Sequence, residues 1–205
     1  MKSEIERKKP SGVADHASLA ITTCGVGYLP LAPGTWGSIV GVGIYLGVAK
    51  LAVFVSSDFA AFNEYVWPTA DYPTRGIPPY ILGITHAIIL VAIFLFTLIG
   101  MWASSRAVPL LGNTDPSEAV IDEVIGQFIV FLFVPFAITW PLVLAGFILF
   151  RLFDIIKPYP IDALQVLPGG VGICADDILA GIYAGISLAV IYAGYLYFFG
   201  DSTIL

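Results

Sequence analysis

The run YILGITHAIILVAIFLFTLIGMW, residues 80–102, decides the fold class. It carries no charged side chain, and an apolar helix of about 20 residues or more is long enough to cross the hydrocarbon core of a bilayer. Of the 205 residues in the chain, 58% are hydrophobic and 12% are charged. Together with a mean hydropathy of +0.91, this composition is too apolar for a soluble domain. The sequence therefore predicts an integral membrane protein.

Two further apolar segments are expected to span the membrane in the same bundle. Residues 38–55 precede the 80–102 run and contain glycines, which allow a neighbouring helix to approach closely. Residues 178–199 end in aromatic side chains, which are typical of membrane interfaces. The polar and proline-containing stretch 56–79 is predicted to be an external loop.

The apolar segment 124–150 contains Pro135 and Pro141, which favour two shorter helices over one long helix. A hairpin at these prolines would join a helix over residues 116–134 to a return helix that ends at Lys157. With the N terminus inside, this topology places most lysines and arginines on the cytoplasmic side. We therefore predict an all-α, polytopic membrane bundle of about five transmembrane helices.

The chain begins with a polar segment, residues 1–17, that is not followed by the long apolar core of a signal peptide. We expect a polar cytoplasmic N-terminal tail here, and one membrane-embedded domain over residues 18–205. The first part of that domain, residues 18–38, is apolar but broken by glycines and prolines. Irregular backbone at membrane depth is tolerated only beside protein or a water-filled cavity. This segment is therefore predicted to be interfacial or re-entrant, close to a pocket.

Acidic residues occur at the ends of the predicted spans. The stretch VGICADDILAGIY, residues 171–183, places Asp176 and Asp177 at the mouth of an apolar helix. A carboxylate at a membrane boundary costs free energy unless it is paired, capped or bound to a metal, so the doublet indicates a functional site. Asp176 alone could instead be a helix N-cap, which favours aspartate at a positive helix end.

A second acidic group precedes the proposed hairpin. Asp115, Glu118 and Asp122 are spaced i, i+3 and i+7, so a helix would place them on one face. Asp115 is followed by proline and could simply be the N-cap of that helix. Asp122 and Glu123 have no such structural explanation, and we expect them to belong to a site.

The return helix ends with Arg151, Asp154 and Lys157, spaced by three on one face. These residues could form a salt-bridge ladder at the membrane boundary. In the hairpin topology, however, they lie at the same membrane face as the other acids. Clustered carboxylates without histidine or cysteine select a hard cation such as Mg²⁺, and the two basic side chains can donate to a phosphoryl group.

The GTWGS stretch, residues 34–38, starts a predicted helix on the same side. Free backbone amides at a helix N-terminus suit a phosphate, although the glycines could equally serve helix packing. A metal site and a phosphate site together at a membrane surface predict phosphoryl chemistry on a lipid.

Four ordered blocks carry these residues. They are GVGYLPLAPGTWGSIVG (25–41), DPSEAVIDEVIGQ (115–127), FRLFDIIKPYPI (150–161) and GGVGICADDILAG (169–181). In this order they resemble the phosphatidylglycerophosphatase A family, the magnesium-dependent lipid phosphatases of the bacterial inner membrane. The resemblance does not cover the polar N terminus or the stretch 56–79.

The resemblance implies an enzyme that hydrolyses phosphatidylglycerol phosphate to phosphatidylglycerol and inorganic phosphate in phospholipid biosynthesis. It implies a multi-pass protein of the bacterial inner membrane whose active site faces the cytoplasm, with Mg²⁺ as cofactor and a lipid as substrate. The net charge of -6 does not suggest nucleic-acid binding, and no protein partner is evident from the sequence. The implied metal ligands, one of them also a general base toward water, are Asp122, Glu123, Asp154, Asp176 and Asp177. Lys157 completes the implied catalytic set. The implied substrate-binding residues are Gly34, Thr35, Gly37, Ser38, Arg151 and Lys157.

Three alternatives stay open at this point. An aspartate could attack phosphorus and form an aspartyl-phosphate, although direct attack by water is preferred. A cation- or proton-coupled transporter could use the same acidic cluster, but the chain has no internal repeat and its acids lie at one end of the helices. A non-catalytic membrane subunit could use the same charges as structural ion pairs.

Overall fold

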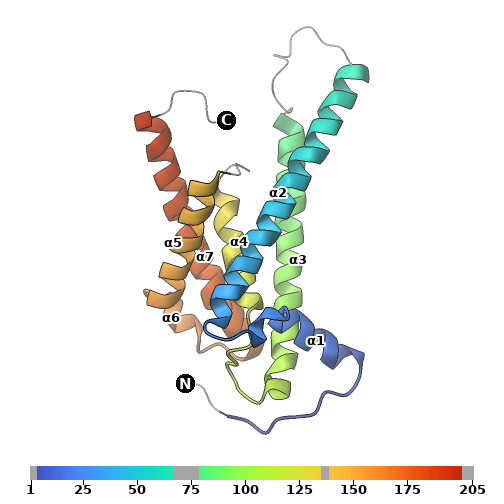
Figure 1. Ribbon diagram of the computed structural model, residues 1–205, viewed down its shortest axis with the longest axis vertical. Coiled ribbons are helices and arrows are strands. Elements are labelled where there is room, and N and C mark those ends of the chain that lie inside the picture. The colour runs from blue at the N-terminus through green and yellow to red at the C-terminus, as the bar shows by residue number, and fades with distance from the viewer. Residues whose placement is uncertain (1–3, 67–78, 135–138, 200–205) are drawn as a thin grey trace.

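The computed structural model describes residues 4–66, 79–134 and 139–199, and these residues are built from helices (Figure 1). The long helices are α2 (Pro33–Val66), α3 (Pro79–Leu111), α5 (Trp140–Ile156) and α7 (Gly169–Phe199). The shorter ones are α1 (Val13–Thr23), η1 (Val26–Tyr28), α4 (Ile121–Val130), η2 (Phe131–Phe133) and α6 (Ile161–Leu164). No strand occurs within the described ranges, and the all-α prediction is confirmed.

The short helix α4 lies inside the bundle and packs against both α2 and α7 (Figure 1). Glycines allow these backbones to meet. A Cβ atom on Gly126 of α4 would lie 2.5 Å from the carbonyl oxygen of Asp177 in α7. A Cβ atom on Gly37 of α2 would lie 2.8 Å from the carbonyl oxygen of Val120. Both crossings therefore need a residue without a side chain, as in other closely packed membrane helices.

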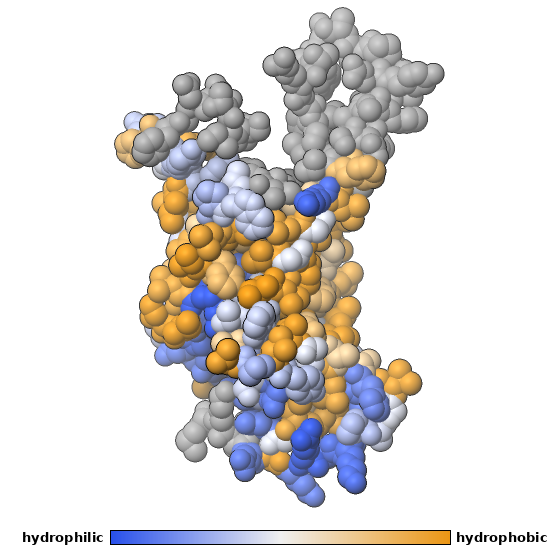
Figure 2. All heavy atoms as spheres, in the orientation of Figure 1, coloured by the Kyte–Doolittle hydropathy of each residue, from blue (hydrophilic) through white to orange (hydrophobic). Residues whose placement is uncertain are grey.

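Two helical stretches, Ala87–Leu111 and Gly169–Phe198, are long and apolar enough to cross a bilayer. Large apolar side chains face outward on α2, α3, α5 and α7, and Figure 2 shows them as a broad band, with hydrophilic atoms gathered at the end that carries α1. On α3 the exposed apolar side chains run from Ile84 to Trp102. At 1.5 Å per residue this is about 27 Å, close to the thickness of the hydrocarbon core. These features suggest association with a membrane.

The helix predicted over residues 116–134 is wrong in its length. The structure forms α4 with ten residues, which is about 15 Å and too short to cross the hydrocarbon, followed by the single turn η2. The reason lies in the backbone before α4. The N–H of Val120 donates to the carbonyl of Thr22 at 2.9 Å, and the N–H of Ala119 to that of Pro116 at 3.1 Å. Contact with α1 therefore holds this stretch in a loop.

Two other predicted boundaries also differ from the structure. Helix α2 continues to Val66, well into the segment 56–79 that was predicted to be a loop, and the rest of that segment lies outside the described residues. Helix α7 begins at Gly169, earlier than the predicted span 178–199. The tight turn of the predicted hairpin near Pro135 also falls partly outside the described residues.

The N-terminal segment is attached to α3. The N–H of Lys8 donates to the carbonyl of Pro109 in the last turn of α3, and the N–H of Ile5 donates to the carbonyl of Gly112 just after that helix. Helix α1 begins at Val13 and so includes the end of the predicted tail, residues 1–17. The Nε of Arg106 on α3 donates to Asp15 Oδ1 at 2.7 Å, which ties α1 to the same helix. This segment thus covers the hydrophilic end of the bundle (Figures 1 and 2).

Candidate functional site

A cavity of about 870 Å³ lies where α2 and α4 begin and α5 ends. Its walls come from segments that are far apart in the sequence. The predicted site residues that line it are Gly34, Asp122, Glu123, Arg151, Asp154, Lys157, Asp176 and Asp177. Asp122 and Asp154 therefore lie at the same end of the bundle, as the hairpin topology requires.

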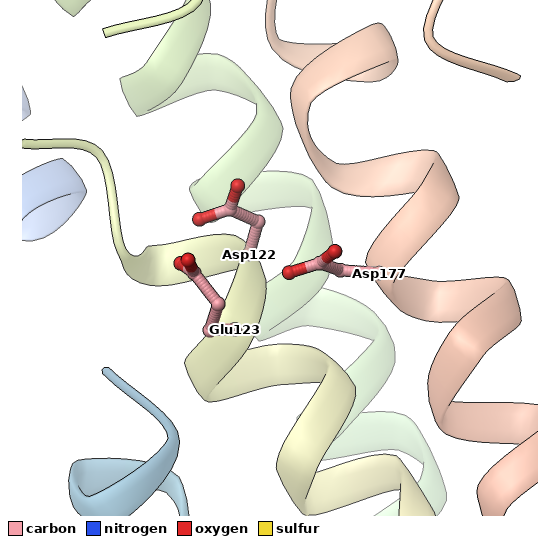
Figure 3. A group of neighbouring side chains, drawn as sticks. All are labelled: Asp122, Glu123 and Asp177. Atoms are coloured by element: carbon pink, nitrogen blue, oxygen red, sulfur yellow. The ribbon is translucent and has the colours of Figure 1, made fainter. Parts of the chain in front are cut away.

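Three of the carboxylates face one another, as Figure 3 shows. Asp122 and Glu123 come from the first turn of α4, and Asp177 comes from α7. One oxygen atom of each lies within 4.8 Å of the others. The close contact of Gly126 with the Asp177 carbonyl fixes the separation of the two helices beside this group. We call Asp122, Glu123 and Asp177 the carboxylate triad.

The triad fits a hard divalent cation. Asp122 Oδ1 and Glu123 Oε2 are buried and accept no hydrogen bond from the described residues. Buried carboxylate oxygens without partners are costly, and an all-oxygen donor set is what Mg²⁺ or a similar ion prefers. A cation at this place would supply the missing partner.

Two further carboxylates of the cavity, Asp154 and Asp176, contact basic side chains. Asp154 Oδ2 lies 2.7 Å from Arg151 Nη1, and Asp154 Oδ1 lies 3.5 Å from Lys157 Nζ. Asp176 Oδ2 accepts hydrogen bonds from Lys157 Nζ and, at 3.0 Å, from Gln165 Nε2. The i, i+3 salt bridges expected for a ladder on α5 are thus present, and the residues that form them line the cavity. Gln165 was not predicted, because no pattern in the sequence distinguishes it from other loop residues.

Lys157 connects the paired carboxylates to the triad. It caps α5 in a left-handed conformation, with φ of 45°, and its Nζ lies 3.9 Å from Asp177 Oδ1. Burial by itself lowers the pKa of Lys157, but the charges of Asp177, Asp176 and Asp154 outweigh it and hold the pKa above its ordinary value. The ammonium is therefore a permanent positive charge beside the triad.

Of the GTWGS stretch, Gly34 alone lines the cavity. The N–H of Thr35 donates to the carbonyl of Ala32 at 3.0 Å, and the hydroxyl of Ser38 donates to the carbonyl of Gly34 at 2.9 Å. Gly37 packs against α4, as the helix-packing alternative expected. The start of α2 therefore forms one wall of the cavity, with most of its polar groups used inside the helix.

Two structural alternatives from the sequence are wrong. Asp176 is not an N-cap, because α7 begins at Gly169 and the aspartate lies inside the helix. Asp115 is not the N-cap of α4 either, since Val120 occupies that position. Asp115 and Glu118 belong to the loop before α4, so they do not share a helical face with the triad.

Comparisons with known proteins agree with this site. The sequence model of the family described as phosphatidylglycerophosphatase A matches residues 19–192. A protein of Bacteroides thetaiotaomicron named "Putative phosphatidylinositol-3-phosphatase" is 34% identical over 170 residues, covering 82% of this chain and 89% of its own. Phosphatidylglycerophosphatase A of Haemophilus influenzae is 34% identical over 161 residues, covering 78% of each chain.

Phosphatidylglycerophosphatase A of Escherichia coli K12 is 39% identical over 103 residues, which are 50% of this chain and 55% of that protein. No solved structure matches the chain significantly. The family match covers all four blocks that the sequence singled out, from residue 25 to residue 181. None of these matches supports the transporter alternative.

Proposed function

The chain belongs to the phosphatidylglycerophosphatase A family and is a lipid phosphatase, and from this premise we propose that it hydrolyses phosphatidylglycerol phosphate to phosphatidylglycerol and inorganic phosphate. The observation that carries the proposal is the carboxylate triad in a cavity that also holds Arg151 and Lys157. A cation and two basic side chains match the negative charge of a phosphomonoester and of its transition state.

Within this proposal, Asp122, Glu123 and Asp177 hold Mg²⁺. When bound there, Mg²⁺ would polarise the phosphoryl group and favour deprotonation of an attacking water. The sequence resemblance also placed Asp154 and Asp176 among the metal ligands. Their contacts with Arg151 and Lys157 favour a different role for them, in which they hold the two basic side chains in the cavity.

The protein residues then act in one displacement at phosphorus. A triad carboxylate accepts the proton of the attacking water as general base. Lys157, which lies 3.9 Å from the triad, stabilises the charge on the phosphoryl oxygens. The bond from phosphorus to the glycerol oxygen breaks, and that oxygen takes a proton from solvent water and leaves as a hydroxyl group. The general base then returns its proton to solvent. We prefer this route to an aspartyl-phosphate intermediate, because a cation held by the triad would favour deprotonation of an attacking water.

We further propose that the protein is a multi-pass protein of the bacterial inner membrane whose cavity faces the cytoplasm. Helices α2, α3, α5 and α7 would cross the bilayer, and α4 with η2 would be a fifth inserted segment that reaches only part of the way. The outward apolar side chains of the four long helices support this arrangement. The basic residues around the cavity agree with the cytoplasmic bias of lysine and arginine.

The test is phosphate release from phosphatidylglycerol phosphate by the purified full chain in detergent, with Mg²⁺ and with a chelator. We expect release that depends on Mg²⁺ and is lost in Asp122→Asn. The matched control is Asp162→Asn, which removes an exposed carboxylate of α6 that does not line the cavity. A folded parent protein that releases no phosphate, or an Asp122→Asn variant with full activity, would contradict the proposal.

A further inference from the structure

Arg151 lies at the boundary between the cavity and the apolar outer surface. Its neighbours on α5 are exposed: Ile148, Leu152 and Ile155 have exposed fractions of 55%, 47% and 71%. The Arg151 side chain is 20% exposed and lines the cavity. A charged side chain surrounded by lipid-facing residues costs free energy unless it is bound to an anion. Arg151 therefore reaches inward from a surface that is otherwise suited to acyl chains.

The facing wall is the start of α2. A Cβ atom on Gly34 would lie 3.1 Å from Arg151 Nη1, and Ser38 Oγ lies 3.5 Å from the same atom. Trp36 and Ile39, on the outer side of this helix, are exposed. Figure 2 shows hydrophilic atoms that interrupt the apolar band between α5 and α2. This rim is thus a polar opening in a lipid-facing surface.

The cavity contains two cations at different positions along α5, since Lys157 caps the end of the helix and Arg151 lies six residues before it. Lys157 contacts the triad residue Asp177, whereas Arg151 lies at the lipid-facing rim. Asp154 lies between the two cations, because one of its carboxylate oxygens contacts Arg151 and the other contacts Lys157. The Arg151 guanidinium carries five donors, so Asp154 and Ser38 leave donors for a further anion. Two separated cations suit a ligand with two separated negative groups.

The lipids in the names of the relatives carry two separated negative groups. Phosphatidylglycerol phosphate and phosphatidylinositol 3-phosphate each carry a phosphomonoester on a small alcohol, which a phosphodiester joins to diacylglycerol. Phosphatidic acid carries the monoester directly on diacylglycerol and has no diester. We propose, building on the proposed function, that Arg151 binds the lipid phosphodiester at the rim between α2 and α5, while the monoester lies beside Lys157 and the triad. Arg151 is then the residue that selects phosphorylated headgroups over phosphatidic acid.

The test compares three lipids with identical acyl chains in mixed micelles: phosphatidylglycerol phosphate, phosphatidylinositol 3-phosphate and phosphatidic acid. We expect the parent chain to have a higher kcat/KM for the two diester lipids. Arg151→Gln should lower kcat/KM for these two by about 10- to 100-fold, the usual effect of losing a hydrogen bond to a charged group. Its kcat/KM for phosphatidic acid should fall by a smaller factor than for the two diester lipids, because phosphatidic acid has no diester for Arg151 to bind. Lys50→Gln, which removes an exposed cation elsewhere on α2, should change none of the three.

Arg151→Lys keeps the charge and serves if the glutamine variant does not fold. Lysine lacks the planar pair of donors, so this variant should lose activity on the diester lipids selectively. An equal loss on all three lipids, or a parent enzyme that prefers phosphatidic acid, would overturn the role of Arg151 while leaving phosphatase activity intact. No hydrolysis of any lipid by the folded parent would instead refute the proposed function itself.

Discussion

Gly126→Ala tests whether helix packing sets the geometry of the carboxylate triad. The new Cβ atom would lie 2.5 Å from the carbonyl oxygen of Asp177 and 2.6 Å from the ring of Phe150, whereas ordinary contacts begin near 3.4 Å. Relief of this overlap requires α7 to move by about 1 Å relative to α4, and misplacements of that size can cost about 100-fold in rate. Alanine is the better helix former by about 1 kcal/mol, so the expected loss cannot come from helix propensity.

The measurement is phosphate release as a function of Mg²⁺ concentration. We expect the variant to need more Mg²⁺ for half-maximal rate and to show a maximal rate about 100-fold lower, because Asp177 no longer meets Asp122 and Glu123. Gly43→Ala is the matched control, since Gly43 lies in α2 with nothing within 4 Å of an added Cβ atom. Parent-like Mg²⁺ dependence and rate in a folded Gly126→Ala protein would refute the reasoning.

The remaining predictions concern single carboxylates. Asp122→Asn should weaken Mn²⁺ binding, measured by electron paramagnetic resonance without substrate, by at least about 10-fold, and unchanged binding would remove Asp122 from the metal site. Asp154→Asn should raise the KM for the lipid by a larger factor than the Mg²⁺ concentration needed for half-maximal rate, because Asp154 contacts Arg151 and Lys157 and not the triad. A larger rise in that Mg²⁺ concentration would instead identify Asp154 as a metal ligand. The N–H of Ser11, and then Arg106, lower the pKa of Asp15, so its stabilising effect is present above about pH 4 and is lost as the pH falls through the lowered value. The difference in Tm between the parent and Asp15→Asn should therefore vanish in acid, and a difference independent of pH would exclude the ion pair as its cause.

Apolar runs predicted the long helices well, because a segment such as 80–102 carries no charged side chain and a helix pairs all its backbone polar groups internally. The same rule failed for the segment before the hairpin. Its apolar residues suit a spanning helix, but a hydrogen bond from Val120 to Thr22 holds the preceding backbone in a loop. That contact joins residues nearly a hundred positions apart, and no local pattern encodes it. Sequence periodicity therefore located α4 but not where it begins.

The sequence predicted which residues belong to the candidate site, but it did not predict which of their side chains contact each other. Charge type and helix-end position were enough to select Asp122, Asp154 and Asp177, because few other polar groups occur in so apolar a chain. They did not indicate which acids meet each other and which meet Arg151 or Lys157. That division depends on side-chain direction at the crossings of α4, α5 and α7, which follows from packing contacts such as that of Gly126.

This division explains why a cluster of acids and bases can persist at the edge of an apolar bundle. Asp154 and Asp176 contact Arg151 and Lys157 and so hold these side chains in the cavity, although Asp176 Oδ1 has no hydrogen-bond partner among the described residues. Two members of the triad are not compensated in this way, since Asp122 Oδ1 and Glu123 Oε2 lack hydrogen-bond partners among the described residues. A fully paired cluster would have no affinity left for a cation or a phosphate. An entirely unpaired one would cost too much free energy on folding. In the proposed mechanism, chemistry at this surface therefore depends on the oxygens of Asp122 and Glu123 staying unpaired until a cation binds.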